Sequence, residues 1–412
     1  MTLSSRRGWR RGVAMIAAAV LVGGLPAAPA AAGTTTTDTA LQWYDATAAA
    51  VATSTLPQVT NSRAWAISWL AAARATGTAP TGNPRHYRDA ALASAVHTAL
   101  STLLPDGAAA LDTALRTTLG RIPDGRAKDR GVATGRAEAR KLLAQRTGDG
   151  LDPTSVNPAY PNPGPGPGSW QPTPPSFSPA QQAGTRFARP FLLDRTDRYR
   201  PGPPPALDSE RYRADLAEVR AYGAVDSAVR TPQQTDTATF WLGSSLTLYT
   251  GILRAALAQS TGPVAGRASL VAIFHVALVD TQIATSDAKY AYLRWRPVTA
   301  IRADAAGDPA WTPLHTTPAH PDYPSGHNTY SGAAEQVLTA LVGSQAREPY
   351  TITSPSQPGA TRTYPDWRGP TRENVDARVW SGIHTRTADE VGVRLGRDVA
   401  AHTLRNAPRL FR

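Results

Sequence analysis

Prolines divide this chain of 412 residues into two parts and limit what can lie between them. Of its 36 prolines, 15 fall between Asp152 and Pro205. Proline lacks a backbone N–H and clashes with the preceding helical turn, so this stretch can be neither regular helix nor a central strand. Its prolines alone would permit a disordered linker. Because aromatic residues are interleaved with them (Trp170, Phe177, Phe187 and Phe191), we expect a long ordered connector packed on helices.

Apolar residues recur with helical spacing on both sides of this connector. The N-terminal part is rich in alanine up to about residue 144, and helical patterns then resume over five ranges: 210–222, 233–258, 265–303, 331–341 and 374–404. No run of alternating β-branched residues is long enough to suggest a strand. We therefore predict a mainly α protein. Its predicted parts are a signal peptide (1–32), an N-terminal helical region (33–150), the connector (151–206) and a C-terminal helical bundle (207–412).

The composition excludes several classes of protein. The chain has no cysteine, which rules out disulfide scaffolds, thiol nucleophiles, iron–sulfur clusters and cysteine-ligated zinc. Its apolar fraction of 41%, about half once glycine is added, is that of a globular protein. The net charge is +12. Because the basic residues are scattered among acids, nucleic-acid binding is disfavoured.

The first 32 residues have the pattern of a secretory signal peptide. Arginines at positions 6, 7, 10 and 11 precede an apolar stretch at 13–25, and three alanines at 30–32 provide a cleavage site before Gly33. Thirteen residues are too few to span a bilayer about 30 Å thick as a helix. We expect a secreted, extracytoplasmic chain that does not span the membrane. Whether export uses the general or the twin-arginine route stays open.

The first of three chemically notable patches runs from Lys289 to Pro297. Helical positions seven apart differ by about 20°, so Lys289 and Arg296 would lie on one stripe of a helix, about 10 Å apart along its axis. Pro297 would then disturb or end that helix. Two cations on an otherwise aromatic face favour an anion between them, although a solvated basic edge has the same pattern.

The second patch runs from His320 to His327. Apolar spacing downstream predicts a helix with Ser325 at its N-cap. The unpaired N–H groups and positive dipole of such an end favour an oxyanion. Gly326 permits close approach of the backbone, and His327 projects from the same turn. A plain turn into a helix would also explain these residues.

The third patch joins Arg378 to His384. On a straight helix the two side chains would lie about 120° apart. Both could serve one ligand only if the arginine reaches round the helix or the helix distorts near Gly382. A structural role for a buried histidine is the alternative.

Taken together, the patches resemble the three-part signature of the superfamily of vanadium-dependent haloperoxidases and type 2 phosphatidic acid phosphatases. Lys-x6-Arg-Pro is followed after 26 residues by Pro-Ser-Gly-His, and after 50 more by Arg-x5-His. Further segments look like the secreted bacterial haloperoxidase-like branch: 168–175, 190–191, 240–241, 287–290 and 382–384. The resemblance covers most of the chain from about Trp65 onward. It implies an all-α helical bundle of the haloperoxidase/acid phosphatase type.

The resemblance also implies roles for individual residues. Five would form the oxyanion-binding site: Lys289, Arg296, Ser325, Gly326 and Arg378. His384 would bond to the metal of vanadate, or attack phosphorus in a phosphatase. His327 would be the acid–base group. His320 would lie in the halide pocket, where algal bromoperoxidases have histidine and a fungal chloroperoxidase has phenylalanine, so it favours bromide.

The chain departs from the pattern of this superfamily at three positions. Ala377 replaces the serine usual before the third-patch arginine, and Ser286 replaces a tryptophan that many haloperoxidases carry. Ala388 stands where an acid is common, four residues after His384, and Asp389 follows it. These changes affect the expected halide pocket and the surroundings of the anion site, while the anion-binding residues themselves are all present.

Three functions remain compatible with this sequence. The first is a vanadate-dependent haloperoxidase, which uses hydrogen peroxide to oxidise halide, bromide rather than chloride, and halogenates small organic acceptors. The second is a secreted acid phosphatase that forms a phosphohistidine at His384 and needs no cofactor. The third is a non-catalytic anion-binding protein of the cell envelope. The oligomeric state is not predictable from the sequence.

Overall fold

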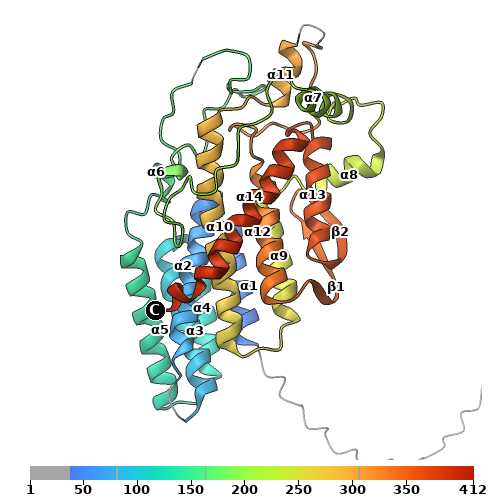
Figure 1. The fold of residues 1–412 in the computed structure, drawn as a ribbon. Coiled ribbons are helices and arrows are strands. Elements are labelled where there is room, and N and C mark those ends of the chain that lie inside the picture. Colours follow the sequence, from blue (N-terminus) through green and yellow to red (C-terminus); the bar gives the residue numbers. More distant parts are fainter. Residues whose placement is uncertain (1–37, 80–81, 163, 305–306) are drawn as a thin grey trace, which may run out of the picture. The chain divides into compact units, whose positions relative to one another are not determined.

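Helices form where the sequence combines apolar periodicity with a favourable first turn. The longest helix is α10 (Val264–Tyr292). The computed structural model describes residues 38–412 apart from 80–81, 163 and 305–306. Within these residues it has fourteen α-helices and one two-stranded sheet (Figure 1). The mainly α prediction is confirmed. The predicted signal peptide lies outside the described residues.

Five helices make up the N-terminal part. They are α1 (Thr39–Ala52), α2 (Gln58–Gly77), α3 (Pro84–Leu103), α4 (Ala108–Gly120) and α5 (Arg126–Gln145). Helix α3 packs against both α2 and α5, and α2 packs in turn along α10. Proline at the first position of α3 costs no hydrogen bond, because that N–H would have no partner inside the helix.

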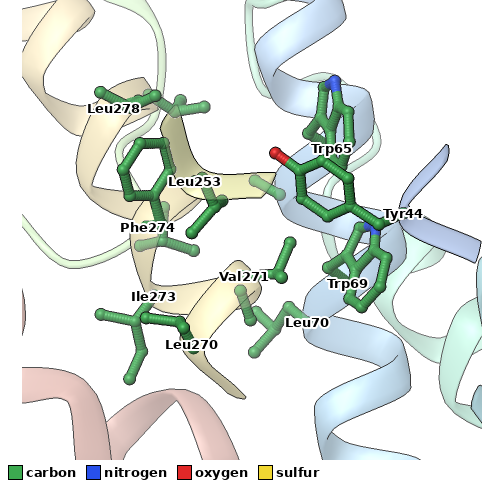
Figure 2. Close-up of a cluster of buried hydrophobic side chains, with 14 of the residues drawn as sticks. Tyr44, Trp65, Trp69, Leu70, Leu253, Leu270, Val271, Ile273, Phe274 and Leu278 are labelled. Atoms are coloured by element: carbon green, nitrogen blue, oxygen red, sulfur yellow. The ribbon is translucent and has the colours of Figure 1, made fainter. Parts of the chain in front are cut away.

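The main hydrophobic core lies where α1, α2 and α10 meet α9 (Ser245–Ala258). Figure 2 shows Tyr44, Trp65 and Trp69 facing aliphatic side chains of α10. The Tyr44 and Trp65 ring centroids are 4.8 Å apart and the rings are tilted, an arrangement that suits aromatic quadrupoles. This core holds α10 rigidly against the N-terminal helices.

Helix α10 is apolar on nearly all sides because neighbours surround it. It contacts α2 on one side and α12 (Gly326–Leu341) and α14 (Arg386–Asn406) on the other (Figure 1). Among the described residues it is the one helix whose length and hydropathy would suit a membrane span. However, 94% of that apolar window is buried inside the protein, as expected of a core helix.

The proline-rich connector is ordered and is attached to α10, as the sequence predicted. Its described residues contain a short α-helix, α6 (Pro153–Val156), and a 3-10 helix at Thr185–Phe187. The fully buried Asp280 carboxylate accepts hydrogen bonds from three successive backbone N–H groups at residues 191–193. Closer to the C-terminal end of α10, the Ser286 hydroxyl donates to the Gln182 carbonyl at 2.8 Å. These contacts satisfy backbone groups that a strand or helix would otherwise pair.

The C-terminal part contains shorter helices than predicted. Besides α9, α10, α12 and α14 they are α7 (Glu210–Tyr222), α8 (Pro232–Phe240), α11 (Pro297–Ala303) and α13 (Arg368–Trp380). The predicted helix at 210–222 is confirmed. Those at 233–258, 265–303 and 374–404 are wrong as single helices, because each is divided by a loop. Two of these loops carry residues of the candidate site.

Helices α12 and α14 approach each other closely because α14 has glycines where they meet. A Cβ atom at Gly396 would lie 2.1 Å from the Thr329 carbonyl oxygen, and one at Gly392 would lie 2.7 Å from that of Ser325. Both distances are too short for any side chain. The two glycines therefore set the position of the first turn of α12, where Ser325 lies.

The structure also contains a hairpin that the sequence pattern did not indicate. Strand β1 (Gln345–Ser354) pairs antiparallel with β2 (Gln357–Asp366) between α12 and α13. Only a few inward residues, such as Tyr350, Ile352 and Tyr364, are buried, because one face is solvated. Such a short, half-exposed alternation is hard to distinguish from a loop in a single sequence.

Candidate active site

A cavity of about 190 Å³ lies where the connector, α10 and the first turns of α12 meet. Most of the residues that line it have polar side chains: Gln58, Gln181, Gln182, Gln282, Thr285, Ser286, Lys289, Tyr290, Pro318, His320, Gly326, His327, Thr329, Tyr330 and His384. Five of the eight residues that the sequence singled out are among these. The other three, Arg296, Ser325 and Arg378, are buried and interact with the lining residues.

Three buried cations surround this cavity. Lys289, Arg296 and Arg378 are each at most 4% exposed. Burial lowers the pKa of Lys289 well below its ordinary value, and lowers the pKa of each arginine to about 10. The carboxylates that act on them electrostatically are Asp322 and Asp389. Three cations and two carboxylates leave an excess of buried positive charge, which an anion would neutralise.

Lys289 and Arg296 come together in a different way from the predicted helical stripe. Helix α10 ends at Tyr292, and Leu293 then takes the left-handed conformation with φ +49°. Arg296 is the N-cap residue of α11, with Pro297 in its first turn. The prediction of one continuous helix was wrong, because a left-handed residue redirects the chain before Arg296. Pro297 therefore begins a helix.

Ser325 occupies the N-cap of α12, as predicted. Its side chain makes no capping hydrogen bond, and its buried hydroxyl has no hydrogen-bond partner among the described residues, although it lies near enough to Asp389 to oppose the rise in the pKa of that carboxyl. The first-turn N–H groups of a helix have no partners within that helix. A Cβ at Gly326 would lie 3.8 Å from the Lys289 side chain, which passes beside this turn. The helix end and a cation thus share one side of the cavity.

The chain bends at Gly382, between the arginine and the histidine of the third patch. The sequence had left open whether the helix distorts here or the arginine reaches round it. Helix α13 ends at Trp380, and Gly382 has φ +77°. A Cβ there would meet the Gly223 carbonyl oxygen at 2.3 Å. The bend lets Arg378 and His384 approach the same cavity from successive segments. Arg378 donates to the Trp241 carbonyl at 3.1 Å, while its buried Nε has no partner.

The hydrogen bonds of His384 assign its two ring nitrogens. Nδ1 lies 2.6 Å from Asp322 Oδ1, while one Arg296 guanidinium nitrogen lies over the ring, 3.1 Å from Nε2 and 3.4 Å from Nδ1. The carboxylate accepts from Nδ1–H, so Nε2 carries the lone pair. Burial and the neighbouring cations lower the pKa of His384 well below its ordinary value. The ring is therefore neutral, with a proton on Nδ1.

Of the other two histidines of the site, one is assigned in the same way. His327 Nε2 lies 3.0 Å from the Gly243 carbonyl, which can only accept, so Nδ1 of the neutral ring carries the lone pair. His320 is different, because its Nδ1 lies 3.0 Å from the Arg296 guanidinium, a donor, and 3.3 Å from the Pro321 carbonyl, an acceptor, so these contacts are compatible with either tautomer. Burial lowers the pKa of both imidazoles well below the ordinary value.

Two of the three departures in the sequence, Ala388 and Ser286, have visible structural consequences. Ala388 is fully buried against Tyr323 and Val391. The next residue, Asp389, accepts from Asn328 at 2.7 Å. The Ser286 hydroxyl holds Gln182 of the connector at the cavity wall.

Two acids of the site were not predicted as site residues, although Asp389 was noted beside Ala388. Asp322 lies inside the second patch but has no motif of its own, and its contact with His384 spans 62 residues. Asp389 follows the expected acidic position by one residue. No group of three potential metal-ligating acids, histidines or cysteines occurs in the part of the chain that the structure describes.

Comparison with known proteins bears on this arrangement. Residues 269–412 match the family of the VCPO second helical-bundle domain. This match supports the resemblance to the superfamily of vanadium-dependent haloperoxidases and type 2 phosphatidic acid phosphatases over these residues. The matched range contains every residue of the three patches, from Lys289 to His384.

Individual members of the superfamily resemble this chain to different extents. The vanadium chloroperoxidase of Curvularia inaequalis is 27% identical over an alignment of 227 residues, and the match covers 40% of this chain and 37% of that protein. A bacterial vanadium-dependent iodoperoxidase has the same fold at TM-score 0.75 and 23% identity, covering 88% of this chain and 94% of its own. The apo form of a bacterial vanadium-dependent chloroperoxidase matches at TM-score 0.69 and 17% identity, with 85% and 93% covered.

Proposed function

We propose that this protein is a vanadate-dependent haloperoxidase, which uses hydrogen peroxide to oxidise halide and halogenates small organic acceptors. One observation carries the proposal. Lys289 lines a cavity, Arg296 and Arg378 are buried beside its histidines, and His384 and His327 each have one ring nitrogen with a lone pair. This combination suits a tetrahedral oxyanion that bonds to His384, with His327 available to deprotonate a reactant.

Vanadate fits these residues by charge and by donor chemistry. The buried excess of positive charge and the unpartnered Arg378 Nε both call for an anion. Lys289, Arg296 and Arg378 would neutralise its oxygens, and the N–H groups at Ser325 and Gly326 would add donors. His384 Nε2 would be the ligand to vanadium. When bound, vanadate would supply the Lewis-acidic centre at which peroxide is activated.

His327 and His320 would have different roles in the reaction. His327 Nδ1 accepts a proton from incoming hydrogen peroxide, while its Nε2–H stays bonded to Gly243 and keeps the ring in place. The surrounding cations disfavour the protonated ring, so His327 readily gives the proton back. His320 lines the same cavity, and because algal bromoperoxidases have histidine at this position, we propose that bromide is preferred to chloride.

Halogenation assays test this proposal directly. Purified protein with orthovanadate, peroxide and bromide should brominate a phenol reporter well above the rate of vanadate alone. His384→Ala should fall to that background. Arg254→Ala, which removes an exposed arginine paired with Asp45, serves as a matched control that keeps activity. Wild-type rates no higher than the vanadate control with bromide, iodide and chloride would reject the proposal.

A phosphatase is the second candidate, because the same cations and His384 Nε2 suit a phosphoryl group. A vanadate-free assay with an aryl phosphate separates the two functions. Hydrolysis that is lost in His384→Ala, without halide oxidation, would favour the phosphatase. Binding of vanadate or phosphate with neither activity would instead indicate an anion-binding protein.

We also propose that the protein is exported, as its N-terminal pattern suggests. A secreted oxidant-producing enzyme without cysteines has no thiols to lose to its own product.

A further inference from the structure

The side chain of Asp322 is held on both oxygens inside the candidate site. Oδ1 lies 2.6 Å from His384 Nδ1, and Oδ2 accepts from the Thr385 hydroxyl at 2.8 Å. Asp322 is 1% exposed, and so is His384. The backbone of Asp322 is fixed as well, because its N–H donates to the Arg294 carbonyl at 2.9 Å and its carbonyl accepts from Lys289.

His384 is thus held by side chains from two different segments. The Asp322 carboxylate accepts from Nδ1–H, whereas one guanidinium nitrogen of Arg296 lies over the ring, 3.1 Å from Nε2 and 3.4 Å from Nδ1. The carboxylate selects the tautomer, because it accepts a hydrogen bond and so requires the proton on Nδ1. Among the described residues, these are the two side chains within hydrogen-bond distance of the imidazole nitrogens.

We propose that Asp322 is a positioning residue that holds His384 with its proton on Nδ1 and its lone pair on Nε2, directed at the anion site. The opposite tautomer would present an N–H to the anion and could not bond to its central atom. A carboxylate on the far nitrogen also makes the near nitrogen a stronger donor to a metal or to phosphorus. This inference rests on the proposed function only in that His384 is the group that bonds to the anion.

Asp322 thereby takes the place of the acid that is common four residues after the ligand histidine. The sequence of the second patch did not reveal this role. Position 388, on the first turn after His384, holds a buried alanine in contact with Tyr323. The carboxylate comes instead from the loop before α12, which also delivers His320 and Ser325. One loop therefore supplies both the oxyanion site and the orientation of the ligand histidine.

The first test needs no variant. A long-range ¹H–¹⁵N spectrum of histidine-labelled protein without added anion distinguishes the two imidazole tautomers. The signals of His384 are those that vanish in His384→Gln. We expect the Nδ1–H tautomer, with its proton far downfield because the carboxylate is close. An Nε2–H tautomer, or rapid exchange between the two, would overturn the proposal.

The second test compares buried carboxyl groups. In Asp322→Asn and Asp322→Ala we expect the His384 spectrum to lose the single Nδ1–H tautomer, and the affinity for orthovanadate to fall about 10- to 100-fold. Asp215→Asn is the control. Asp215 is also buried and accepts from the backbone of Thr387 in the first turn of α14, but it does not contact His384. It should keep both the tautomer and the affinity.

These readouts separate this inference from the proposed function. Tautomer and vanadate affinity by calorimetry are measured without turnover, so an inactive wild type with the expected spectrum would reject only the haloperoxidase. Conversely, active enzyme whose Asp322→Asn variant keeps the tautomer, the affinity and kcat would reject only the role of Asp322. Thermal melting of the Asp322 and Asp215 variants would show whether a loss of affinity comes from a general loss of structure.

Discussion

His275 has two ring nitrogens without hydrogen-bond partners, although it is fully buried within α10. Its ring stacks on Trp65 with centroids 4.5 Å apart. Burial lowers the pKa of His275 from its ordinary 6.5 to about 3. Between these pH values the unfolded chain binds a proton that the folded protein does not. The free energy of unfolding should therefore decrease as the pH falls below 6.5 and should be unaffected above it.

Replacing this histidine tests the pH dependence. His275→Phe keeps an aromatic ring against Trp65 but cannot be protonated. Between pH 6 and 4 the unfolding free energy of this variant should fall less steeply than that of the wild type. The difference between the two slopes should be about 1.4 kcal/mol per pH unit. Urea denaturation at several pH values measures this slope. His275→Gln should have the same shallow slope if charge is the cause. A slope equal to the wild type in both variants would contradict the argument.

Single residues also differ in how far the sequence revealed them. The spacing of Lys289, Ser325 and His384 resembled a known signature, and the structure brings these residues together around one cavity. Asp322 had no such signal, because its role depends on a contact with a residue 62 positions away. A motif records which groups are present, while hydrogen-bond partners of this kind depend on how loops meet.

Among the elements, the α12–α14 pair places the anion site most directly. Helix α12 begins next to Ser325, and the glycines of α14 allow the two backbones to approach closely. Any side chain at Gly396 would have to displace α12 at the Thr329 carbonyl, which lies one turn from the helix N-terminus. Packing between helices thus sets the position of the oxyanion donors.

Gly396→Ala should therefore destabilise the protein and weaken anion binding together. We expect a loss of about 1–3 kcal/mol in unfolding free energy, as for other overpacked sites. Thermal melting and vanadate calorimetry measure both effects. Gly120→Ala in α4 is the matched control, because nothing lies within 4 Å of a Cβ there, and it should gain about 0.4–1 kcal/mol. Equal stability of the two variants would show that the helices adjust without cost.

At the scale of the whole molecule, α10 connects the N-terminal helices, the connector and the site. Residues 38–412 group into one compact unit, within which α10 contacts α2, α12 and α14. Its last turns carry both Ser286, which holds the connector, and Lys289, which faces the cavity. The connector therefore forms part of the site wall through Gln181 and Gln182.

Export belongs to the same scale and is testable on the expressed protein. Protein recovered from the culture medium should begin at Gly33, as intact mass and N-terminal sequencing would show. Replacing Arg6 and Arg7 by lysine keeps the positive charge, so export should continue by the general route but stop by the twin-arginine route. A full-length chain that stays inside the cell would reject the signal-peptide prediction.

The sequence by itself determined the helical class, the position of the connector and the side chains from which a site could form. Local periodicity and residue type suffice for these features. Only the tertiary structure decided where the chain turns at Leu293 and Gly382, that residues 345–366 form a hairpin, and that Asp322 meets His384. Each of these depends on a left-handed residue or on contact between distant segments. The energies of such contacts exist only once the helices have packed.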